Sequence, residues 1–557
     1  MHETEDLEHR GHSRAQEDGQ LKAEFSTVQR SFGFWAIIIG LGIMLLLAAL
    51  ENTIITTAAP YILAEIPLGD NWVWLTNAFF LASAAFQPLL GQLSNLFGRR
   101  WMILCVISIY TLGSGICGGA TTGTALIAGH TIISDLVPLR YRGNYIAIIL
   151  LIFSIGTTLG ALVGGLLVDH TTWRWCFYIN LPIGAVSLVV MFFFLRVHHR
   201  RDLSVVQRLG RIDYVGNAVL IGGTTSMLIA LAYAGTRYSW SSWNTLLPLL
   251  IGFASFFIFG AFEASRFSPT EPVMPPRLFR NRTSVIIAIN TFLYSTATYW
   301  VIFFLPVYFQ AVKLNSPTRA GINVIPVTLL SVPTASLAAW ALTKWGKFKL
   351  IHLVGFALFN IGLGLFTRLN EHTPTSVWVG YMFVGPVGGG LLLSTQLPAF
   401  QAPVCEADQS LATGSWNFIR TLGGIWGVAI PAAVFSNRIN ELVAAGKIIN
   451  PEAAAMLVDG GAYEHASMAF VHSFPSLLDQ ADIVVVYRLA IQRTFLVCIA
   501  FSGLAFLLCL FEKNIPLRTE LVTDYGLEET SGMSVYIIEY AYTIQQEPEP
   551  APGVEDY

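Results

Sequence analysis

Residues 72–101 read WVWLTNAFFLASAAFQPLLGQLSNLFGRRW, a nearly uncharged apolar segment that ends in two arginines. A helix needs about 20 apolar residues to cross a bilayer, and the first part of this stretch supplies them. Arg99 and Arg100 then stop the apolar segment, and arginines beside a span favour the cytoplasmic side. Gly91 and Gly98 enclose a short polar loop and allow a tight turn between two helices. The stretch therefore predicts a membrane span that leads into a tight cytoplasmic loop.

The whole chain of 557 residues has the composition of a protein that crosses the membrane many times. Hydrophobic residues make up 54% and charged residues only 12%, whereas soluble chains carry about 25% charged residues. The net charge is -3 and no long basic run occurs, so we expect no nucleic-acid partner. The six cysteines are scattered and mostly apolar in context, which indicates small core residues. We therefore expect neither a metal nor a cofactor.

Apolar runs separated by polar turns predict fourteen membrane-spanning helices. An even number places both termini on one side, and most of the 32 Lys and Arg residues fall in segments that this topology puts in the cytoplasm, as the positive-inside rule requires. The predicted spans lie near residues 34–58, 72–92, 101–119, 123–138, 145–168, 175–196, 214–234, 245–264, 285–307, 321–343, 350–367, 377–398, 411–436 and 490–511.

The fourth predicted span is short. Residues 125–137 read ALIAGHTIISDLV and include His130 and Asp135. A helix of this length reaches roughly 20 Å, against a hydrocarbon core of about 30 Å. Two interpretations stay open: a short helix that thins the bilayer around it, or a deletion in the gene model just after Gly129.

The loop after the second span resembles the signature loop of the major facilitator superfamily, G-x-L-x-D-x-x-G-R-R/K. The matching residues are Gly91, Asn95, Gly98, Arg99 and Arg100, with Asn95 where the family has Asp. The resemblance implies a conformational latch between two halves of the protein on the cytoplasmic side. Asn95 can accept a hydrogen bond but carries no charge, so the latch would lack one ionic contact. Alternatively, the two arginines only fix the topology.

Glycines at four-residue spacing follow one face of the fifth predicted span, at Gly156, Gly160 and Gly164, with Gly165 beside them. Such a face allows very close helix packing. The pattern resembles the antiporter signature G-x-x-x-G-P-x-x-G-G of the drug-exporting branch of the superfamily, with Ala161 in place of Pro. The resemblance implies that this helix is a sliding contact in exchange, and a plain packing face is the alternative.

Glu51 and Arg420 lie inside predicted spans and away from their ends, where charge is costly and often functional. Glu51, in Leu50-Glu51-Asn52-Thr53, resembles the acidic motif of helix one in fourteen-helix drug:proton antiporters, which implies a proton-coupling site. A structural role at a wet outer mouth is the alternative. Arg420, in the thirteenth span, could tune the proton site by pairing with an acidic group, bind a substrate anion, or reach back to the membrane surface.

Other polar residues on the spans are candidates for a central substrate cavity, although each could equally be a helix-packing contact. These are Asn77, Gln87, Asn290, Tyr294, Tyr308, Gln310, Gln396 and Asn417, and the aromatic residues Trp300, Phe303 and Trp416 could line the same cavity.

Taken over most of its length, the sequence is most similar to fungal-type fourteen-helix drug:proton antiporters, which include toxin and multidrug efflux pumps. The resemblance implies an all-α polytopic membrane protein with the major facilitator fold, in which two six-helix bundles are joined by two additional linker helices. The expected divisions are a disordered cytoplasmic tail at 1–33, an N-terminal bundle at 34–200, linker helices at 201–266, a C-terminal bundle at 267–511 with a long outer loop at 437–488, and a cytoplasmic tail at 512–557.

The implied function is export of an amphipathic drug, toxin or secondary metabolite by proton antiport and alternating access. The expected partners are the lipid bilayer, a small organic substrate and protons, for a monomer in the plasma membrane or the vacuolar membrane. A transport-inactive sensor or truncated paralogue is one alternative, and uptake of an iron chelate or amino acid is another. An enzyme is not expected, because the sequence lacks a P-loop, a zinc-binding His-Glu-x-x-His motif and a nucleophile elbow.

Overall fold

The computed structural model of the chain consists of helices joined by turns. Ten of the described helices are long and apolar enough to cross a membrane. The number rises to eleven if the bent helix pair Ile39–Ile55 and Thr57–Leu63 counts as one further span. The protein is therefore an integral, multi-pass membrane protein. The structure describes residues 32–66, 74, 78, 86, 89–90, 92–93, 99–122, 124–126, 144–195, 212–234, 238–265, 272–405, 408–458 and 460–516.

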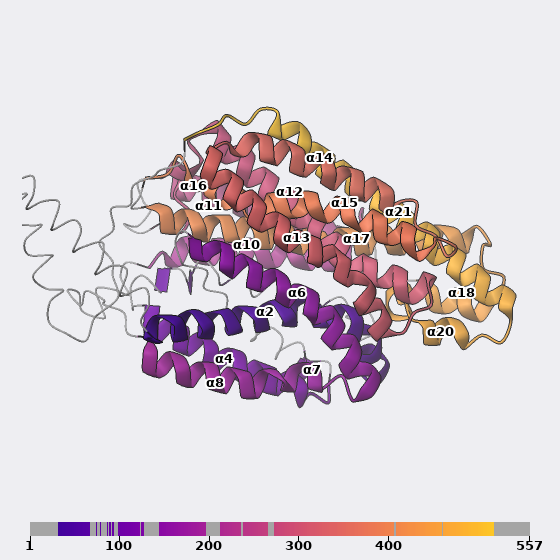
Figure 1. Cartoon of the computed structure of the whole chain (residues 1–557). Helices are drawn as coiled ribbons and strands as arrows, with labels where there is room; N and C mark the ends of the chain where they lie inside the picture. Colours follow the sequence, from indigo (N-terminus) through magenta and orange to yellow (C-terminus); the bar gives the residue numbers. More distant parts are fainter. Residues whose placement is uncertain are drawn as a thin grey trace, which may run out of the picture.

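The N-terminal half forms the lower part of the molecule in Figure 1. Its helix α2 packs along α6 and also contacts α8, while α4 packs on α7 and α8. The described helices of this half are α2 (Phe32–Glu65), α4 (Arg99–Gly118), α6 (Asn144–His170), α7 (Trp175–Tyr178) and α8 (Asn180–Phe194).

The C-terminal half forms the upper part of Figure 1. It contains η2 (Pro276–Phe279), α12 (Arg282–Val307), η3 (Tyr308–Val312), α13 (Pro317–Trp345), α14 (Phe348–Phe366), α15 (Thr375–Leu393), α16 (Gln396–Gln401), α17 (Gln409–Ala444) and α21 (Leu477–Cys509). Local sequence explains several boundaries. The Ser316 side chain caps α13 by accepting from Arg319 N, Pro317 takes the first helical position, and Gly346 ends the helix with φ 63°.

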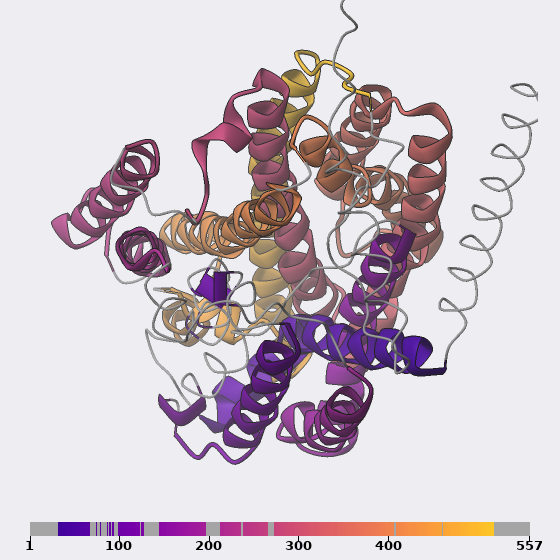
Figure 2. The ribbon, with the colours of Figure 1, turned by 90° about the vertical axis from the view of Figure 1, so that its left-hand side faces the viewer.

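Helices α10 (Tyr214–Tyr233) and α11 (Trp243–Glu263) pack on each other and stand to one side of the other helices, as Figure 2 shows. They contact α17 through ring pairs such as Phe253–Trp426, whose centroids lie 6.3 Å apart. The division of the chain near residues 200 and 266 stays a prediction, because 196–211 and 266–271 lie outside the described residues.

A described helix coincides with each predicted span except those at 72–92 and 123–138, which fall mostly outside the described residues. The count of fourteen spans and the shortness of the fourth therefore stay predictions.

Helix α17 continues to Ala444 and helix α21 begins at Leu477, so both helices enter the segment 437–488 that is expected to be the outer loop. Where the membrane ends along these helices stays a prediction. Arg438 and Arg488 mark the predicted ends of these spans, but Ile439, Leu442 and Ile483 beyond them are buried. Apolar packing thus extends both helices past the charged residues. Between them lie α18 (Pro451–Leu457), α19 (Gly461–Glu464) and α20 (Met468–His472).

Candidate functional site

A cavity of about 110 Å³ lies between α6 of the N-terminal half and helices of the C-terminal half. Thr157 is its lining residue from α6, and α12, α13, α14, α15 and α17 supply the others. Most of the wall is apolar, with Val301, Ile302, Val327, Phe359, Leu363 and Phe366 among the lining residues. Hydroxyl groups interrupt it, from Thr157, Tyr294, Thr298, Tyr299, Thr328 and Ser331.

Arg420 is the one charged side chain among the described residues that line this cavity. By helix rise it lies about 16 Å along α17 from the first residue of that helix. Its guanidinium carbon is 5.8 Å from the ring centroid of Trp416, close enough for a cation–π contact. Arg420 thus faces an internal cavity between the halves, which disfavours the interpretation that it reaches back to the membrane surface.

Two of the hydroxyl groups beside Arg420 differ in their bonding. The Tyr294 hydroxyl donates to the carbonyl of Gly389 at 2.8 Å. The Thr298 hydroxyl is buried and makes no hydrogen bond of full geometry with a described residue, but it lies close enough to the Tyr294 side chain to interact with it. A group that enters the cavity would therefore meet both hydroxyl groups.

Glu51 lies in a different environment, inside the N-terminal half. Its side chain is 0% exposed, and Asn180 Nδ2 of α8 donates to Glu51 Oε2 at 2.5 Å and to Ser114 Oγ of α4 at 3.3 Å. The other carboxyl oxygen, Oε1, has no hydrogen-bond partner among the described residues. This burial places Glu51 in the core of the half rather than at an exposed outer mouth.

The glycine set of α6 divides between two neighbours. A Cβ atom on Gly156 would lie 2.6 Å from the Leu46 carbonyl oxygen of α2, and one on Gly160 would lie 2.5 Å from that of Leu50. Gly164 faces α2 in the same way. Hydrogen bonds support this contact, because Thr53 Oγ1 of α2 donates to the Thr157 carbonyl at 2.7 Å. These three glycines therefore pack within one half.

Gly165 faces the opposite half. A Cβ atom there would lie 2.6 Å from the Pro317 carbonyl oxygen at the start of α13, and one on Gly321 would lie 2.7 Å from the Ala161 carbonyl oxygen. The sequence predicts a sliding contact at residues 156–165. Of the four glycines in this set, Gly165 is the one that contacts the other half.

Polar groups join the halves near the same point. Asp169 Oδ2 accepts from the Thr318 backbone N–H at 3.1 Å and also from the Thr318 hydroxyl. The carboxylate sits at the N-terminus of α13, where the helix dipole favours negative charge. The C-terminus of α6 and the N-terminus of α13 both lie on the side that is predicted to face away from the cytoplasm.

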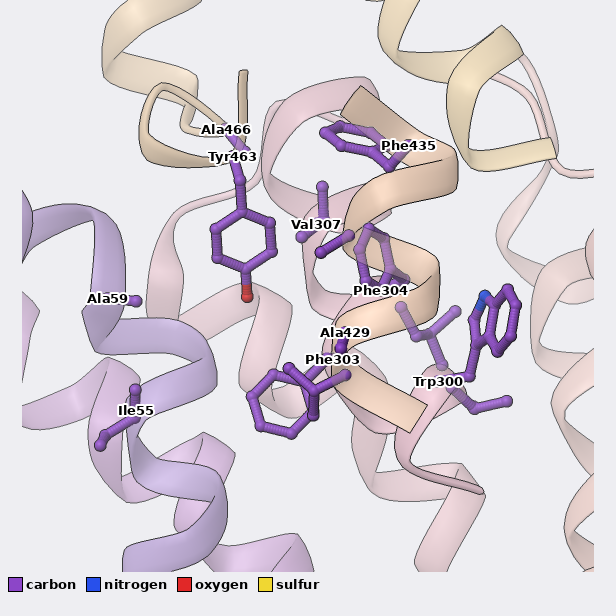
Figure 3. Packing of buried hydrophobic residues seen from close by; sticks show 14 of the residues in the cluster. Ile55, Ala59, Trp300, Phe303, Phe304, Val307, Ala429, Phe435, Tyr463 and Ala466 are labelled. Carbon is purple, nitrogen blue, oxygen red and sulfur yellow. The ribbon is translucent and has the colours of Figure 1, made fainter. Parts of the chain in front are cut away.

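Tyr463 of α19 adds an apolar contact between the halves on that side. Figure 3 shows its ring between Ala59 of α2 and Phe304 of α12, and the two ring centroids of Tyr463 and Phe304 lie 5.9 Å apart. We name the set Gly165, Asp169, Thr318, Gly321 and Tyr463 the outer closure, because it holds together the predicted outer ends of the two halves.

The predicted latch falls largely outside the described residues, which include neither Gly91, Asn95, Gly98 nor the side chain of Arg99. Arg100 is described, and its Nη2 donates to the Phe192 carbonyl at 2.8 Å near the end of α8. Cationic groups are favourable at a helix C-terminus. This contact lies within the N-terminal half, and a latch between the halves stays a prediction.

Of the described cavity candidates, Tyr294 lines the cavity and the others do not. Asn290 donates to Glu512 Oε1 at 2.9 Å, and Tyr308 donates to the Asn370 carbonyl at 2.9 Å, so in this structure both bind groups of the C-terminal half. Gln310, Gln396, Asn417, Trp300, Phe303 and Trp416 are likewise buried away from this cavity. Asn77 and Gln87 lie outside the described residues.

Sequence reasoning missed Asn180, Thr298, Asp169 and Thr318. Asn180 follows an aromatic run in a span, where its polarity could have marked it as a partner for a buried charge. The hydroxyl residues gave no signal, because Thr and Ser are common in membrane helices and only helix rotation shows which of them face a cavity. Among the described residues, no three His, Cys, Asp or Glu side chains are placed to hold a metal ion.

Comparisons with known proteins agree with this architecture. A sequence profile described as Major Facilitator Superfamily matches residues 41–428. The chain is 51% identical over 513 residues to the MFS-type transporter TwmF of Talaromyces wortmannii, covering 89% of this chain and 93% of that one. It is 40% identical over 517 residues to the efflux pump FUS6 of Gibberella moniliformis, covering 90% and 91%. It is also 40% identical over 543 residues to the MFS efflux transporter aclA of Aspergillus oryzae, covering 95% and 97%.

Solved structures share the fold at low sequence identity. One is a bacterial homologue of the human lysosomal transporter Spinster in an inward-facing, occupied conformation, with a TM-score of 0.54 and 13% identity over 87% of this chain and 98% of that chain. Another is the POT family transporter PepTSo, with a TM-score of 0.51 and 15% identity over 85% and 96%.

Proposed function

Because this chain belongs to the Major Facilitator Superfamily and is a transporter rather than an enzyme, we propose that it exports an amphipathic organic compound in exchange for protons. The cargo class is a drug, toxin or secondary metabolite, and the working unit is a monomer in the plasma membrane. Relatives of similar length are named efflux pumps, which supports export over uptake.

The observation that carries the proton step is the burial of Glu51. An ionised carboxylate is costly to bury at membrane depth, so a charged residue retained there points to a function. Uptake and release of a proton supplies that function. Among the described residues, Asn180 is the one donor to the carboxyl group and Oε1 has no partner, which leaves room for the carboxyl group to carry a proton in one state and lose it in another.

The cavity at Arg420 supports an amphipathic cargo. Its wall is mostly apolar, and Arg420 and the hydroxyl groups supply a polar end. Such a mixture, with a few convergent polar groups, is typical of small-molecule sites. The cavity lies between the halves, where transporters of two related bundles bind their cargo.

The outer closure supplies the moving part of the proposal. Its contacts join the halves, so cargo that leaves on the outer side must separate Gly165 from Pro317 and Asp169 from Thr318. Alternating access would then consist of opening this contact while the opposite ends of the halves approach each other.

The test is transport by the purified full-length chain in liposomes with an imposed pH gradient. Three fluorescent amphiphiles serve as probes: neutral Nile red, cationic rhodamine 6G and anionic 2-naphthylacetic acid. We expect at least one probe to accumulate on the acidic side, and nigericin, which exchanges potassium for protons, to abolish that accumulation. Accumulation that persists with nigericin would contradict proton exchange, and the absence of accumulation for every probe would contradict export of amphiphiles.

A further inference from the structure

We propose that the cargo is an organic acid, with one carboxylate or ionised enol that binds Arg420 and an apolar body that lies against the aromatic wall of the cavity. This inference rests on the proposed function, because it names the class of compound that the same cavity carries.

The charge of the cavity is the first argument. Arg420 is its one charged lining residue among those described, and no Asp or Glu side chain is among them. Arginine stays protonated at all ordinary pH values, so the lining brings a fixed positive charge into an apolar space. Coulombic attraction in such a space is much stronger than in water. The described part of the lining therefore favours an anion over a neutral polar group and a neutral group over a cation.

The shape of the guanidinium group is the second argument. It carries five N–H donors in a planar fork that matches the two oxygens of a carboxylate. With five donors, Arg420 can keep its contact with Trp416 and other neighbours while it binds an acid. The hydroxyl groups of Thr298 and Tyr294 line the same cavity and can donate to an acid oxygen.

One part of the wall favours a flat apolar body. Phe359 and Phe366 line it, together with Gly385, Pro386, Gly389 and Leu393 of α15. A Cβ atom on Gly389 would lie 3.5 Å from the Tyr294 hydroxyl and 3.7 Å from the Phe359 ring, so this glycine keeps space beside two aromatic rings. The cavity in this structure has a volume of about 110 Å³, which is enough for the acid group. We expect the apolar body of the cargo to fit when the two halves move apart.

The test compares an acid with its uncharged ester. Binding of 2-naphthylacetic acid and of its methyl ester to the full-length protein in lipid nanodiscs is measured at pH 7, where the acid is ionised. We expect the acid to bind at least about 10-fold more tightly, as for a charge-assisted hydrogen-bonded pair. Equal or tighter binding of the ester would overturn the proposal, and this comparison needs only the wild-type chain.

Variants locate the effect. Arg420→Gln should remove the preference for the acid, and Arg420→Lys should retain part of it, because lysine keeps the charge but loses the planar fork. Arg368→Gln, at an exposed position after α14, is the matched control and should retain the full preference. A preference that persists in a folded Arg420→Gln protein would overturn the assignment to this residue.

Failure of this inference is distinguishable from failure of the proposed function. Gradient-driven accumulation of rhodamine 6G without selective acid binding would overturn the cargo class and leave proton-driven export standing. Selective acid binding without gradient-driven accumulation of any probe would overturn proton-driven export and leave the assignment of an acid-binding cavity standing.

Discussion

Glu51 and Arg420 are both charged residues in membrane-spanning helices, yet their surroundings differ. Glu51 is enclosed by α2, α4 and α8 of one half, with Asn180 as its hydrogen-bond donor. Arg420 lines a cavity with walls from both halves. A proton at Glu51 and cargo at Arg420 would therefore not compete for the same atoms. Under the proposal their coupling would pass through helix packing, and α2 packs most extensively along α6, which reaches the cavity.

One hydrogen bond shows where that coupling can run. Thr53, two residues after Glu51 on α2, donates to the carbonyl of Thr157, and Thr157 itself lines the cavity. A shift of α2 that accompanies protonation would thus move a residue of the cargo cavity. The predictions below test whether the two regions can be disturbed separately.

The largest expected effect is the loss of proton coupling in Glu51→Gln. Glutamine keeps the size and hydrogen-bonding capacity of the side chain but cannot ionise, so we expect gradient-driven accumulation in liposomes to fall to background. Glu65→Gln is the matched control on the same helix, because Glu65 is exposed at its outer end, and it should retain accumulation. Retained accumulation in Glu51→Gln would remove Glu51 from the mechanism.

The next prediction compares the contact that Gly160 makes within one half with the contact that Gly165 makes with the other half. Gly160→Ala places a Cβ atom against the Leu50 backbone within one half, and such overpacking should destabilise the protein by about 1–3 kcal/mol. Gly165→Ala places it against Pro317 of the other half. We expect Gly160→Ala to lower the melting temperature more, and Gly165→Ala to lower the transport rate more. The opposite ranking in both measurements would contradict the division of the glycine face.

A smaller effect is expected at the outer closure. Asp169→Asn keeps the size of the side chain but weakens its charge-assisted bonds to Thr318, so the outer ends should separate more often, by about 1–2 kcal/mol in the equilibrium. Spin labels on the outer ends of α6 and α13 should report a larger share of long distances. Asp479→Asn, outside the closure, is the control, and an unchanged distance distribution in Asp169→Asn would count against the closure.

The smallest effect concerns Glu65, beyond the apolar window of α2 that ends at Leu63. Trp173 Nε1 donates to its carboxylate at 2.6 Å and Arg174 Nη2 lies at 2.9 Å, and these contacts lower the pKa of Glu65. A lowered pKa means that the contribution to stability is present above the ordinary value of 4.5 and is lost as pH falls through the lowered pKa. Glu65→Gln should therefore reduce the melting temperature slightly at pH 7 and progressively less as the pH falls below 4.5, and a reduction that does not change with pH would contradict an ionic role.

The sequence predicted the helical fold well, because apolar runs and their polar boundaries are properties of the chain itself. It did not predict how far α17 and α21 extend, because Arg438 and Arg488 look like the ends of spans, whereas buried residues such as Ile439 and Ile483 continue the helices beyond them. Helix ends in an outer domain are set by tertiary packing, which hydropathy does not contain.

For the site, the sequence could identify rare features and not common ones. Glu51 and Arg420 stand out because charge in a span is costly. From the sequence, Asn290 and Tyr308 are as suitable for a cavity as Tyr294. In the structure, the orientation of α12 and of η3, which follows it, turns their side chains toward Glu512 and Asn370. Thr298, on the same helix, lines the cavity. The rotation of each helix about its axis decides such cases, and it follows from the packing of all the helices together.

The central claim is that the proton and the cargo bind at separate places. Its most direct test is the preference of the folded Glu51→Gln protein for 2-naphthylacetic acid over its methyl ester, measured in nanodiscs at pH 7 beside the wild type. Separate sites predict that the preference is retained to within about twofold, because direct contact with Arg420 sets it, whereas coupling through α2 and α6 changes the affinity for both compounds together. Loss of the preference in Glu51→Gln would show that Glu51 and the acid group share one site and would contradict the account.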